Sequence, residues 1–289
     1  MSISLSDITQ AAVEALLQAS TAFSPDQKAA YERALAAETD KNSRWIMEMV
    51  LENALVAEKN KLPLCDDTGI PHVLLEIGHE AQIRGNPCSL LEAVEDGIAR
   101  GLRALPGRPM AVQGDDLERI SQTKGLSADP AMVLPAPVRI TKARGKQVRL
   151  HVLMLGGGPE IRSRTFRIFH HHDHSCLSRE IIHWAGEMAS KLGCTPCVPA
   201  VGIGRSHYEA ACLAMEAMIF KGFGQEDDLE KSITEALNKT GCGALGLGGK
   251  ITALNTFVKV GPQRASGVRI TSLRLGCCYD PRKSTITLE

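Results

Sequence analysis

Residues 64–72, LCDDTGIPH, place a thiol next to two carboxylates where a helical pattern gives way to a strand-like pattern. Asp66 and Asp67 repel each other, and both disfavour the thiolate form of Cys65. A bound cation offsets both effects, because the thiolate is a metal ligand and a neighbouring acid can act beside it. The segment therefore predicts a metal site, provided that the chain supplies further ligands.

Four other turns contain glycine or cysteine in patterns that suit a site. Three of the five turns place a cysteine next to a glycine, so their side chains can converge above the end of a sheet. In chain order the four are LGGGPE at 155–160, GCTPCVPAVGIGRS at 193–206, GCGALGLGGK at 241–250 and LGCCYDPRK at 275–283.

Two of these turns are similar to nucleotide-binding loops but depart from their patterns. A phosphate-binding loop needs Gly, four residues, then Gly-Lys-Ser/Thr. Here Ala244 stands in place of the first glycine and Ile251 in place of the hydroxyl residue. The segment 201–206, VGIGRS, lacks the third glycine of the dinucleotide fingerprint. We interpret these glycines as points of close backbone approach, or as amides directed at an anion.

The cysteine spacing does not fit a structural zinc site, which usually takes its ligands from closely spaced pairs. Cys194 and Cys197 form one Cys-x-x-Cys pair, but Cys277 and Cys278 are adjacent. Three cysteines suit an iron–sulfur cluster whose fourth iron stays open to substrate, where it acts as a Lewis acid. A zinc or nucleotide enzyme without a cluster is the competing hypothesis.

The turns together resemble the class I fumarase/tartrate dehydratase family of iron–sulfur hydro-lyases, specifically its α subunit or N-terminal half. LCDDTG is similar to the family's cysteine–acid–Asp–Thr–Gly turn, and GGG follows a strand, as in the family. CTPCVPAVGIG, GALGLGGKITAL and GCCYDPRK then follow in the family's order. Five matches in order, over roughly residues 45–289, make the resemblance specific.

The resemblance implies a four-iron–four-sulfur (4Fe-4S) cluster held by three cysteines. Cys65 and Cys277 correspond to two of them by their turns. Cys194 is the preferred middle ligand, because counting back without gaps from the Gly-Ile-Gly at 202–204 reaches it. Cys197 is the alternative, since the proline two residues after it partly imitates the family's Cys-Pro-Pro.

The resemblance also implies substrate-binding and catalytic residues. Asp67 matches the acid that helps to position the base and the substrate, with Asp66 beside it. Arg108 falls where a family arginine binds a substrate carboxylate, for which the guanidinium fork is suited. Lys250 and Arg264 match a lysine and an arginine of the family's substrate site.

Two departures from the family pattern concern the substrate. Asp66 stands where the family usually has Gln, and Ala265 stands where it has His. An extra negative charge and a lost donor weaken the binding of a dicarboxylate such as fumarate. Both a changed substrate and a divergent non-catalytic paralogue, which would serve in iron sensing or cluster assembly, stay open.

The implied function is the reversible addition or removal of water on a small hydroxy-dicarboxylic acid, such as fumarate/malate or tartrate. In the family, the base and further carboxylate-binding residues come from a β subunit or C-terminal half. The last cluster motif lies close to the end of this chain. We therefore expect a separately encoded β subunit and a homodimer or α2β2 assembly.

Composition argues against other partners. Lys plus Arg balances Asp plus Glu at 33 each, so the chain has no net charge that would favour binding to nucleic acid or to a membrane surface. Neither a signal peptide nor a long apolar run is present, and we expect a cytoplasmic protein. The nine cysteines do not suggest a disulfide framework. We assign Cys88, Cys176 and Cys212 to ordinary burial.

The five His and Asp residues at 170–174, in FHHHDHSC, match no part of the family pattern. So dense a run of imidazoles can bind a metal or respond to pH. The alternative is a polar loop that leads into the next helix.

These turns need a scaffold, which we predict as one α/β (α+β) domain over residues 1–289, with a mixed or antiparallel sheet packed with helices. A helix-rich part covers about 1–62, and a cluster- and substrate-binding part covers about 63–289. In the first part, helices start after Ser6, at Ser24-Pro25 and at Lys41.

Further helices are predicted at 86–105, 178–192, 206–221 and 226–238. Strands are predicted at 72–78, 250–261 and 267–276, the last two in one sheet, with a hairpin at 137–155 and a loop-rich region at 106–137.

Overall fold

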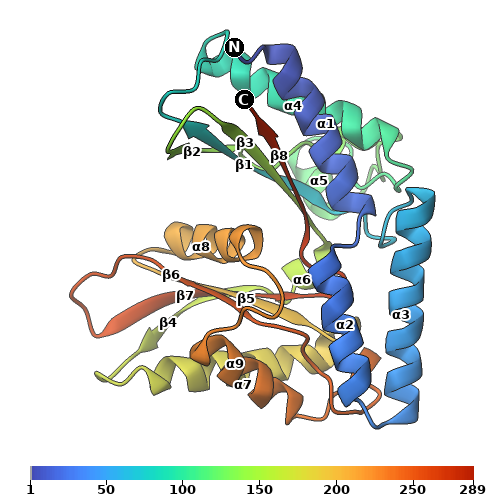
Figure 1. Ribbon diagram of the computed structural model, residues 1–289, viewed down its shortest axis with the longest axis vertical. Coiled ribbons are helices and arrows are strands. Elements are labelled where there is room, and N and C mark those ends of the chain that lie inside the picture. Colours follow the sequence, from blue (N-terminus) through green and yellow to red (C-terminus); the bar gives the residue numbers. More distant parts are fainter. Residues whose placement is uncertain (1) are drawn as a thin grey trace. The chain divides into compact units, whose positions relative to one another are not determined.

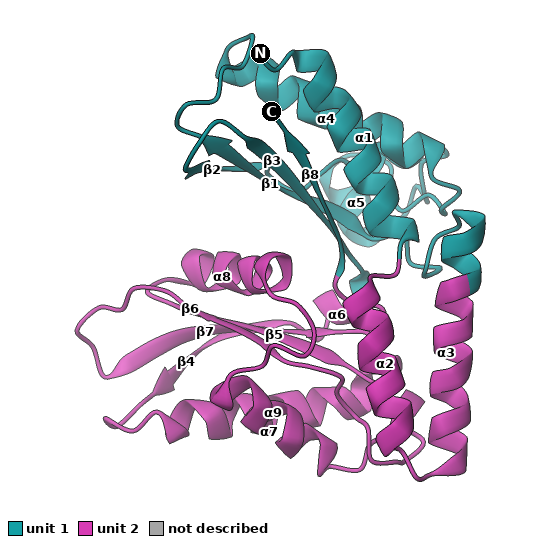
Figure 2. Cartoon of the chain, viewed as in Figure 1, with its two compact units in different colours: residues 1–22, 56–157, 282–289 teal, residues 23–55, 158–281 magenta. Residues whose placement is uncertain are grey.

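The computed structural model describes residues 2–289. The chain forms two compact units, each built from segments that are distant in sequence (Figure 2). Unit 1 comprises Met1–Ala22, Val56–Gly157 and Arg282–Glu289, and unit 2 comprises Phe23–Leu55 and Gly158–Pro281. The division does not follow the expected boundary near residue 62. That residues 1–289 act as one functional domain stays a prediction.

Unit 1 is a mixed sheet with two long helices packed against it (Figure 1). Alternate residues of β3, from Val148 to Met154, are buried with the apolar faces of the helices, as expected for a strand with one face in the core. The sheet order is β2 (Arg139–Ala143), β1 (Ile70–Gly78), β3 (Val148–Leu155), β8 (Arg282–Leu288), and the helices are α1 (Leu5–Thr21) and α4 (Pro87–Ala104).

Two local predictions for unit 1 are wrong. The cap of α1 is Ser4 rather than Ser6, because the Ser4 side chain accepts the N–H of Asp7 while Asp7 bonds back to Ser4. The segment 137–155 supplies two strands but no hairpin, since β1 lies between them, parallel to β2 and antiparallel to β3. The turn at Gly145 therefore joins two strands that are not neighbours.

Unit 2 is a second mixed sheet with helices on both faces. α8 covers one face, and α7 and α9 cover the other (Figure 1). The central strand β5 is buried along its whole length, as expected for a strand covered on both sides. The sheet order is β4 (Arg164–Phe169), β7 (Val268–Gly276), β5 (Val198–Gly204), β6 (Phe257–Val260), and the helices are α7 (Ser175–Leu192), α8 (His207–Phe220) and α9 (Asp228–Asn238).

One of the remaining helices packs against the last cysteine turn of unit 2. Ser24 caps the second helix with Pro25 in its first turn, as predicted. The buried Tyr31 of that helix donates its hydroxyl to the carbonyl of Cys278 at 2.8 Å, which fixes the helix to the last cysteine turn. These elements are α2 (Pro25–Ala37), α3 (Lys41–Asn60), α5 (Asp116–Ser121), α6 (Gly157–Glu160) and the 3-10 turns η1 (Pro130–Val133) and η2 (Ala244–Gly246).

The mixed α+β class is confirmed, and so is each predicted long helix to within a few residues. The strand expected over 250–261 is reduced to β6, and β4, β5 and β8 were not predicted. Cys212 is buried as expected, but Cys88 is exposed, so its assignment to burial is wrong. None of the helices within residues 2–289 combines the length and the apolar character needed to span a bilayer.

Gly202 tests the packing of α8 on β5. A Cβ at this position would lie 2.0 Å from the carbonyl oxygen of Ala210 and 2.4 Å from the nitrogen of Ala214. We expect Gly202→Ala to lower the free energy of unfolding by about 1–3 kcal/mol or more, because the helix must move away from the strand. Urea unfolding followed by circular dichroism measures the change.

Gly186→Ala in α7 is the matched control, since its Cβ would meet its nearest neighbour at an ordinary 3.6 Å. That variant should keep or raise the stability, because alanine favours a helix more than glycine does. Equal unfolding midpoints for the two variants would contradict the close packing of α8 on β5.

Candidate active site

Two of the predicted turns meet at one end of the sheet in unit 1. The Cys65 turn leads into β1 and the Gly-rich turn follows β3, and the register pairs Ile70 with Leu155. Asp67 joins the two turns, because its carboxylate accepts the N–H of Gly69 at 3.1 Å and the N–H of Gly157 at 2.7 Å. The glycine-rich sequence permits this approach, since a Cβ on Gly156 would lie 2.9 Å from Asp67 Oδ2.

Arg282, the first residue of β8, holds the same turn from the buried side. Its guanidinium donates through Nη1 to the carbonyl oxygens of Asp67 at 2.7 Å and Thr68 at 3.2 Å. The side chain is 2% exposed, so a buried cation is stabilised by the main chain of the turn. Sequence analysis included this residue in the turn LGCCYDPRK but did not single it out.

The side chains around Cys65 face a more open environment. The Cys65 thiol donates to Asp66 Oδ1 at 3.6 Å, and Arg108 Nη1 lies 3.7 Å from Asp66 Oδ2. Arg108 is 57% exposed and Asp66 is 85% exposed, so this ion pair contributes little to stability and leaves the guanidinium accessible. Thr68 keeps Arg108 close by donating its hydroxyl to the Arg108 carbonyl at 2.9 Å. Unit 1 thus brings together four of the predicted residues.

In unit 2, Cys194 and Cys277 lie at the same end of the sheet. Cys194 precedes β5 and Cys277 follows β7, and these antiparallel strands pair Val198 with Gly276. The N–H of Cys278 donates to the carbonyl of Cys194 at 2.9 Å, which joins the two turns directly. Cys194 is exposed and Cys277 is largely buried.

Cys197, the alternative ligand, has a different environment. Its side chain is fully buried in the core of unit 2, and burial raises the pKa of its thiol to about 12. Its main chain pairs with the neighbouring segment through the carbonyl of Thr252 at 2.8 Å. A cluster ligand must be a thiolate. These observations favour Cys194, although the ligand set stays a prediction.

The turn after Cys277 depends on a buried charge network. Asp280 accepts the N–H of Cys277 at 3.1 Å and pairs with Arg274 Nη1 at 2.8 Å. Arg274 also pairs through Nε with Glu160 at 2.9 Å. Asp280 is 1% exposed and Arg274 is 5% exposed, so removing Arg274 would leave the buried charge of Asp280 uncompensated, whereas removing Asp280 would leave Arg274 with Glu160 as its counter-charge. This network, which sequence analysis missed, fixes the main chain at Cys277.

The glycine-rich loop at 241–250 lies at the same end of unit 2. Thr195, next to Cys194, donates its hydroxyl to the carbonyl of Gly243 at 2.6 Å. Two amides at the end of the loop point at an anion, the protein's own Glu38. They belong to Lys250 and Ile251 and not to the glycines, whose amides one interpretation of the sequence expected to point at an anion. Glu38 Oε2 accepts the N–H of Lys250 at 2.8 Å and the N–H of Ile251 at 3.0 Å.

Glu38 is 3% exposed and was also missed by sequence analysis. Its other carboxylate oxygen accepts the N–H of Thr39 at 2.8 Å and the N–H of Asp40 at 2.9 Å. Burial raises the pKa of Glu38, but these hydrogen bonds from four main-chain amides lower it, and the net pKa lies below its usual value. The loop is therefore held by a carboxylate that stays ionised.

The two other predicted substrate residues lie at different places in unit 2. Lys250 has an exposed side chain at the end of the glycine-rich loop. Arg264 is exposed in the loop that precedes β7, whereas Cys277 follows β7. A nine-residue strand is roughly 30 Å long, so within one chain Arg264 and Cys277 lie at opposite ends of the sheet. The structure does not bring Arg264 to the cysteines.

Three cysteine thiolates are a donor set that suits an iron–sulfur cluster. Taken by itself, each unit within residues 2–289 groups no three His, Cys, Asp or Glu side chains as ligands of one ion. The His run supplies none, and His170 is engaged through both ring nitrogens, by the carbonyl of Ser266 at 2.8 Å and the N–H of His172 at 3.0 Å. The three predicted cysteines all lie in turns fixed by buried hydrogen bonds.

Comparisons with known proteins agree with the motif order. A family model described as fumarate hydratase (Fumerase) matches residues 9–287. A putative L(+)-tartrate dehydratase subunit alpha of Methanocaldococcus jannaschii is 28% identical over 276 residues, which cover 94% of this chain and 93% of that protein. The L(+)-tartrate dehydratase subunit alpha of Escherichia coli is 23% identical over 260 residues, 88% of this chain and 81% of that protein.

A putative fumarate hydratase class I of Geobacillus stearothermophilus is 25% identical over 226 residues. The match covers 72% of this chain but 41% of that protein. The chain thus corresponds to most of each alpha subunit and to less than half of the longer enzyme.

Glu38→Gln tests the anchor of the glycine-rich loop. We expect the free energy of unfolding at pH 7 to fall by about 1–3 kcal/mol, because an amide group cannot accept all four N–H donors. The folded-state pKa of Glu38 is lowered, so the carboxylate stabilises the fold above its unfolded-state pKa, and this contribution is lost as pH falls through the folded-state value. Urea titrations at several pH values measure it.

The difference in the free energy of unfolding between wild type and Glu38→Gln should therefore become smaller as pH falls below about 4. Glu32→Gln, an exposed glutamate on α2, is the control and should change stability little. If this difference in the free energy of unfolding does not change with pH, the charge of Glu38 is not what holds the loop.

Proposed function

This chain belongs to the fumarate hydratase (Fumerase) family, and from that premise we propose that it is the α subunit of an iron–sulfur hydro-lyase. The reaction is the reversible addition or removal of water on a small hydroxy-dicarboxylic acid. The family match over residues 9–287 carries the proposal. The near full-length correspondence with proteins named as tartrate dehydratase alpha subunits supports it.

Cys65, Cys194 and Cys277 would hold a 4Fe-4S cluster. When bound, the cluster supplies an open, Lewis-acidic iron that polarises the C–O bond to be broken. The exposure of Cys194 and the partial exposure of Cys65 suit ligands that border a substrate site. The buried Asp280 keeps the Cys277 turn in one conformation, so its sulfur does not have to be ordered when the cluster binds.

Arg108 would bind one substrate carboxylate. Its guanidinium is exposed and only loosely paired with Asp66, so a substrate carboxylate can take the bidentate position. Asp67 would act as a positioning residue rather than as the base, because both its oxygens already accept main-chain N–H groups. The base would then come from outside this chain.

Asp66 bears on the choice of substrate. An ionised carboxylate only accepts hydrogen bonds, so it repels a further substrate carboxylate but can accept a hydrogen bond from a substrate hydroxyl. We therefore favour an acid with an additional hydroxyl, such as tartrate, over fumarate itself. The 85% exposure of Asp66 leaves it free to face a substrate.

The names of the relatives and the length of the match support a second subunit. Two relatives are named as alpha subunits, and this chain corresponds to 41% of a longer enzyme. A separately encoded β subunit would supply the base and further carboxylate-binding groups, in an α2β2 assembly or around a homodimer of this chain. We place the complex in the cytoplasm, where cysteines are kept reduced.

Single cysteine variants test the ligand set. After anaerobic reconstitution with iron and sulfide, we expect wild type and Cys197→Ala to bind about four iron and four sulfide per chain. Cys65→Ala, Cys194→Ala and Cys277→Ala should each lose most of the iron and the visible absorption of the cluster. Cys197→Ala is the matched control, since it removes a buried thiol from the same turn as Cys194.

If Cys194→Ala keeps a full cluster and Cys197→Ala loses it, the middle ligand is Cys197 instead of Cys194. Retention in both Cys65→Ala and Cys277→Ala would remove the basis of the proposed site.

Activity should depend on the partner subunit. We expect the reconstituted chain alone to be at least about a hundredfold less active than the complex with β, because general acid–base catalysis contributes a factor of that order or more. A panel of tartrate, malate and fumarate should show the highest kcat/KM for tartrate. Full turnover by this chain without a second polypeptide would contradict the proposal that a β subunit supplies the base.

A complex with an intact cluster and no activity on the panel would instead favour a divergent, non-catalytic role. Asp66→Gln separates the two cases, because it should shift preference towards fumarate only in an active enzyme.

A further inference from the structure

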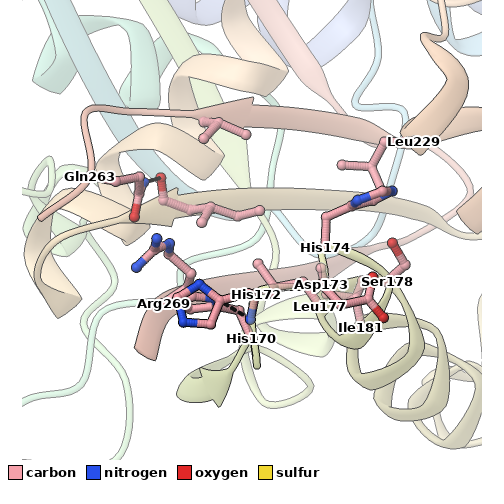
Figure 3. Close-up of a pocket in the computed structure, with 12 residues that line it drawn as sticks. His170, His172, Asp173, His174, Leu177, Ser178, Ile181, Leu229, Gln263 and Arg269 are labelled. Atoms are coloured by element: carbon pink, nitrogen blue, oxygen red, sulfur yellow. Dashed lines mark hydrogen bonds between the residues drawn. The ribbon is translucent and has the colours of Figure 1, made fainter. Parts of the chain in front are cut away.

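A pocket of about 470 Å³ opens at the end of the unit 2 sheet opposite the cysteine turns (Figure 3). Its walls come from the His170–His174 run, α7, α9 and the sheet edge where β5 and β6 end and β7 begins. The volume lies within the range of small-molecule sites. Neither the cluster nor the substrate residues of the proposed reaction use this pocket.

The floor of the pocket is apolar and continuous with the core of unit 2. Ile181 and Ile203 are buried core residues, and Leu177 and Leu229 pack against the same core. Val260 completes the floor towards solvent and is 57% exposed. An apolar chain or ring placed here would remove this surface from water.

One side of the pocket is basic. Figure 3 shows Arg269, His170 and His172 grouped together, and His174 near Leu229. Arg269 Nη1 donates to the carbonyls of Ser266 and Val268, both at 3.0 Å. No acidic side chain pairs with Arg269 among residues 2–289, so its charge has no anionic partner in the structure.

The acid of the pocket is already engaged. Asp173 accepts the N–H of Ser175 at 2.9 Å through Oδ1 and the hydroxyl of Ser175 at 2.5 Å through Oδ2. Its carboxylate is therefore bonded to Ser175, the first residue of α7, and does not pair with Arg269. The pocket thus combines an apolar floor with one cation that lacks a counter-charge.

Metal binding does not explain this arrangement. Both ring nitrogens of His170 are used by protein groups, and no group of three metal-ligating side chains forms in the described part of unit 2. Of the two other imidazoles, His172 lies beside Arg269 and can act as a hydrogen-bond donor there, whereas His174 lies near Leu229.

We infer that this pocket binds a small organic acid that carries an apolar chain or ring, at a site separate from the hydro-lyase site. The carboxylate pairs with Arg269 and accepts hydrogen bonds from the neighbouring imidazole, and the apolar part lies on Ile181, Ile203 and Val260. Neither the apolar floor nor the guanidinium suffices alone, so both parts of the ligand are required.

Calorimetric titration of the full chain with hexanoate tests the inference. We expect saturable binding of hexanoate with a Kd on the order of 0.1–1 mM, as for a well-matched fragment. Acetate, which lacks the apolar chain, and hexanol, which lacks the charge, should bind at least about tenfold more weakly.

Two variants address the two halves of the pocket. Arg269→Gln should weaken hexanoate binding by about tenfold or more, since it removes a charge-assisted hydrogen bond. Val260→Trp should block binding by filling the floor from the solvent side. Arg144→Gln, which removes the same charge from an exposed turn in unit 1, is the control and should leave binding unchanged.

Each variant's circular dichroism spectrum and melting temperature should match wild type, so that a loss of binding reports the pocket itself. Absence of saturable hexanoate binding by wild type would overturn the inference. Binding that survives both Arg269→Gln and Val260→Trp would also overturn it, because the acid would then bind elsewhere.

Discussion

Buried ionised side chains that are hydrogen-bonded to the main chain of neighbouring turns are the constraint on which the site residues of this protein depend. Arg282 donates to the carbonyls of the Cys65 turn, Asp280 accepts the N–H of Cys277, and Glu38 accepts two amides of the glycine-rich loop. A buried charge without such partners is strongly unfavourable, so each of these turns has one well-defined conformation. The charges act as anchors, while the side chains proposed to do chemistry stay more exposed.

This division of roles explains why two adjacent acids occur in one turn. Asp67 is bound by two main-chain amides and holds the turn together, whereas Asp66 points outwards beside Arg108. The repulsion between the two carboxylates is reduced because each has its own partner. The two positions are therefore unequal, and a substitution at Asp66 changes the surface of the site while one at Asp67 changes its framework.

Unit 2 uses the two ends of its sheet for different purposes. The cysteine turns and the glycine-rich loop lie where β5 begins and β7 ends. The His170–His174 run and Arg269 lie at the other end, with an apolar floor supplied by the core. The family motifs belong to the first end. The run that matched no family motif belongs to the second.

Much of the fold could be predicted from local signals. Helices such as α1 and α4 have an apolar face and a capping side chain, and the cysteine- and glycine-bearing turns were found by their composition. Strand β5 could not be predicted, because burial on both faces removes the alternation that marks a strand. The hairpin prediction failed for a related reason, since adjacency in sequence does not reveal that β1 lies between β2 and β3. Glu38, Arg274 and Arg282 were missed because a buried charge has the same appearance in sequence as a solvated one.

The sequence by itself determined the kind of chemistry, because the order of the cysteine and glycine motifs is a property of the chain alone. It also determined the departures from the family at Asp66 and Ala265, which are matters of residue identity. Although motif spacing already preferred Cys194 to Cys197, only the tertiary structure gave the difference in their exposure, since exposure depends on what covers each sulfur. It alone also separated Arg264 from Cys277, because the direction of β7, invisible in the sequence, places them at opposite ends of the sheet.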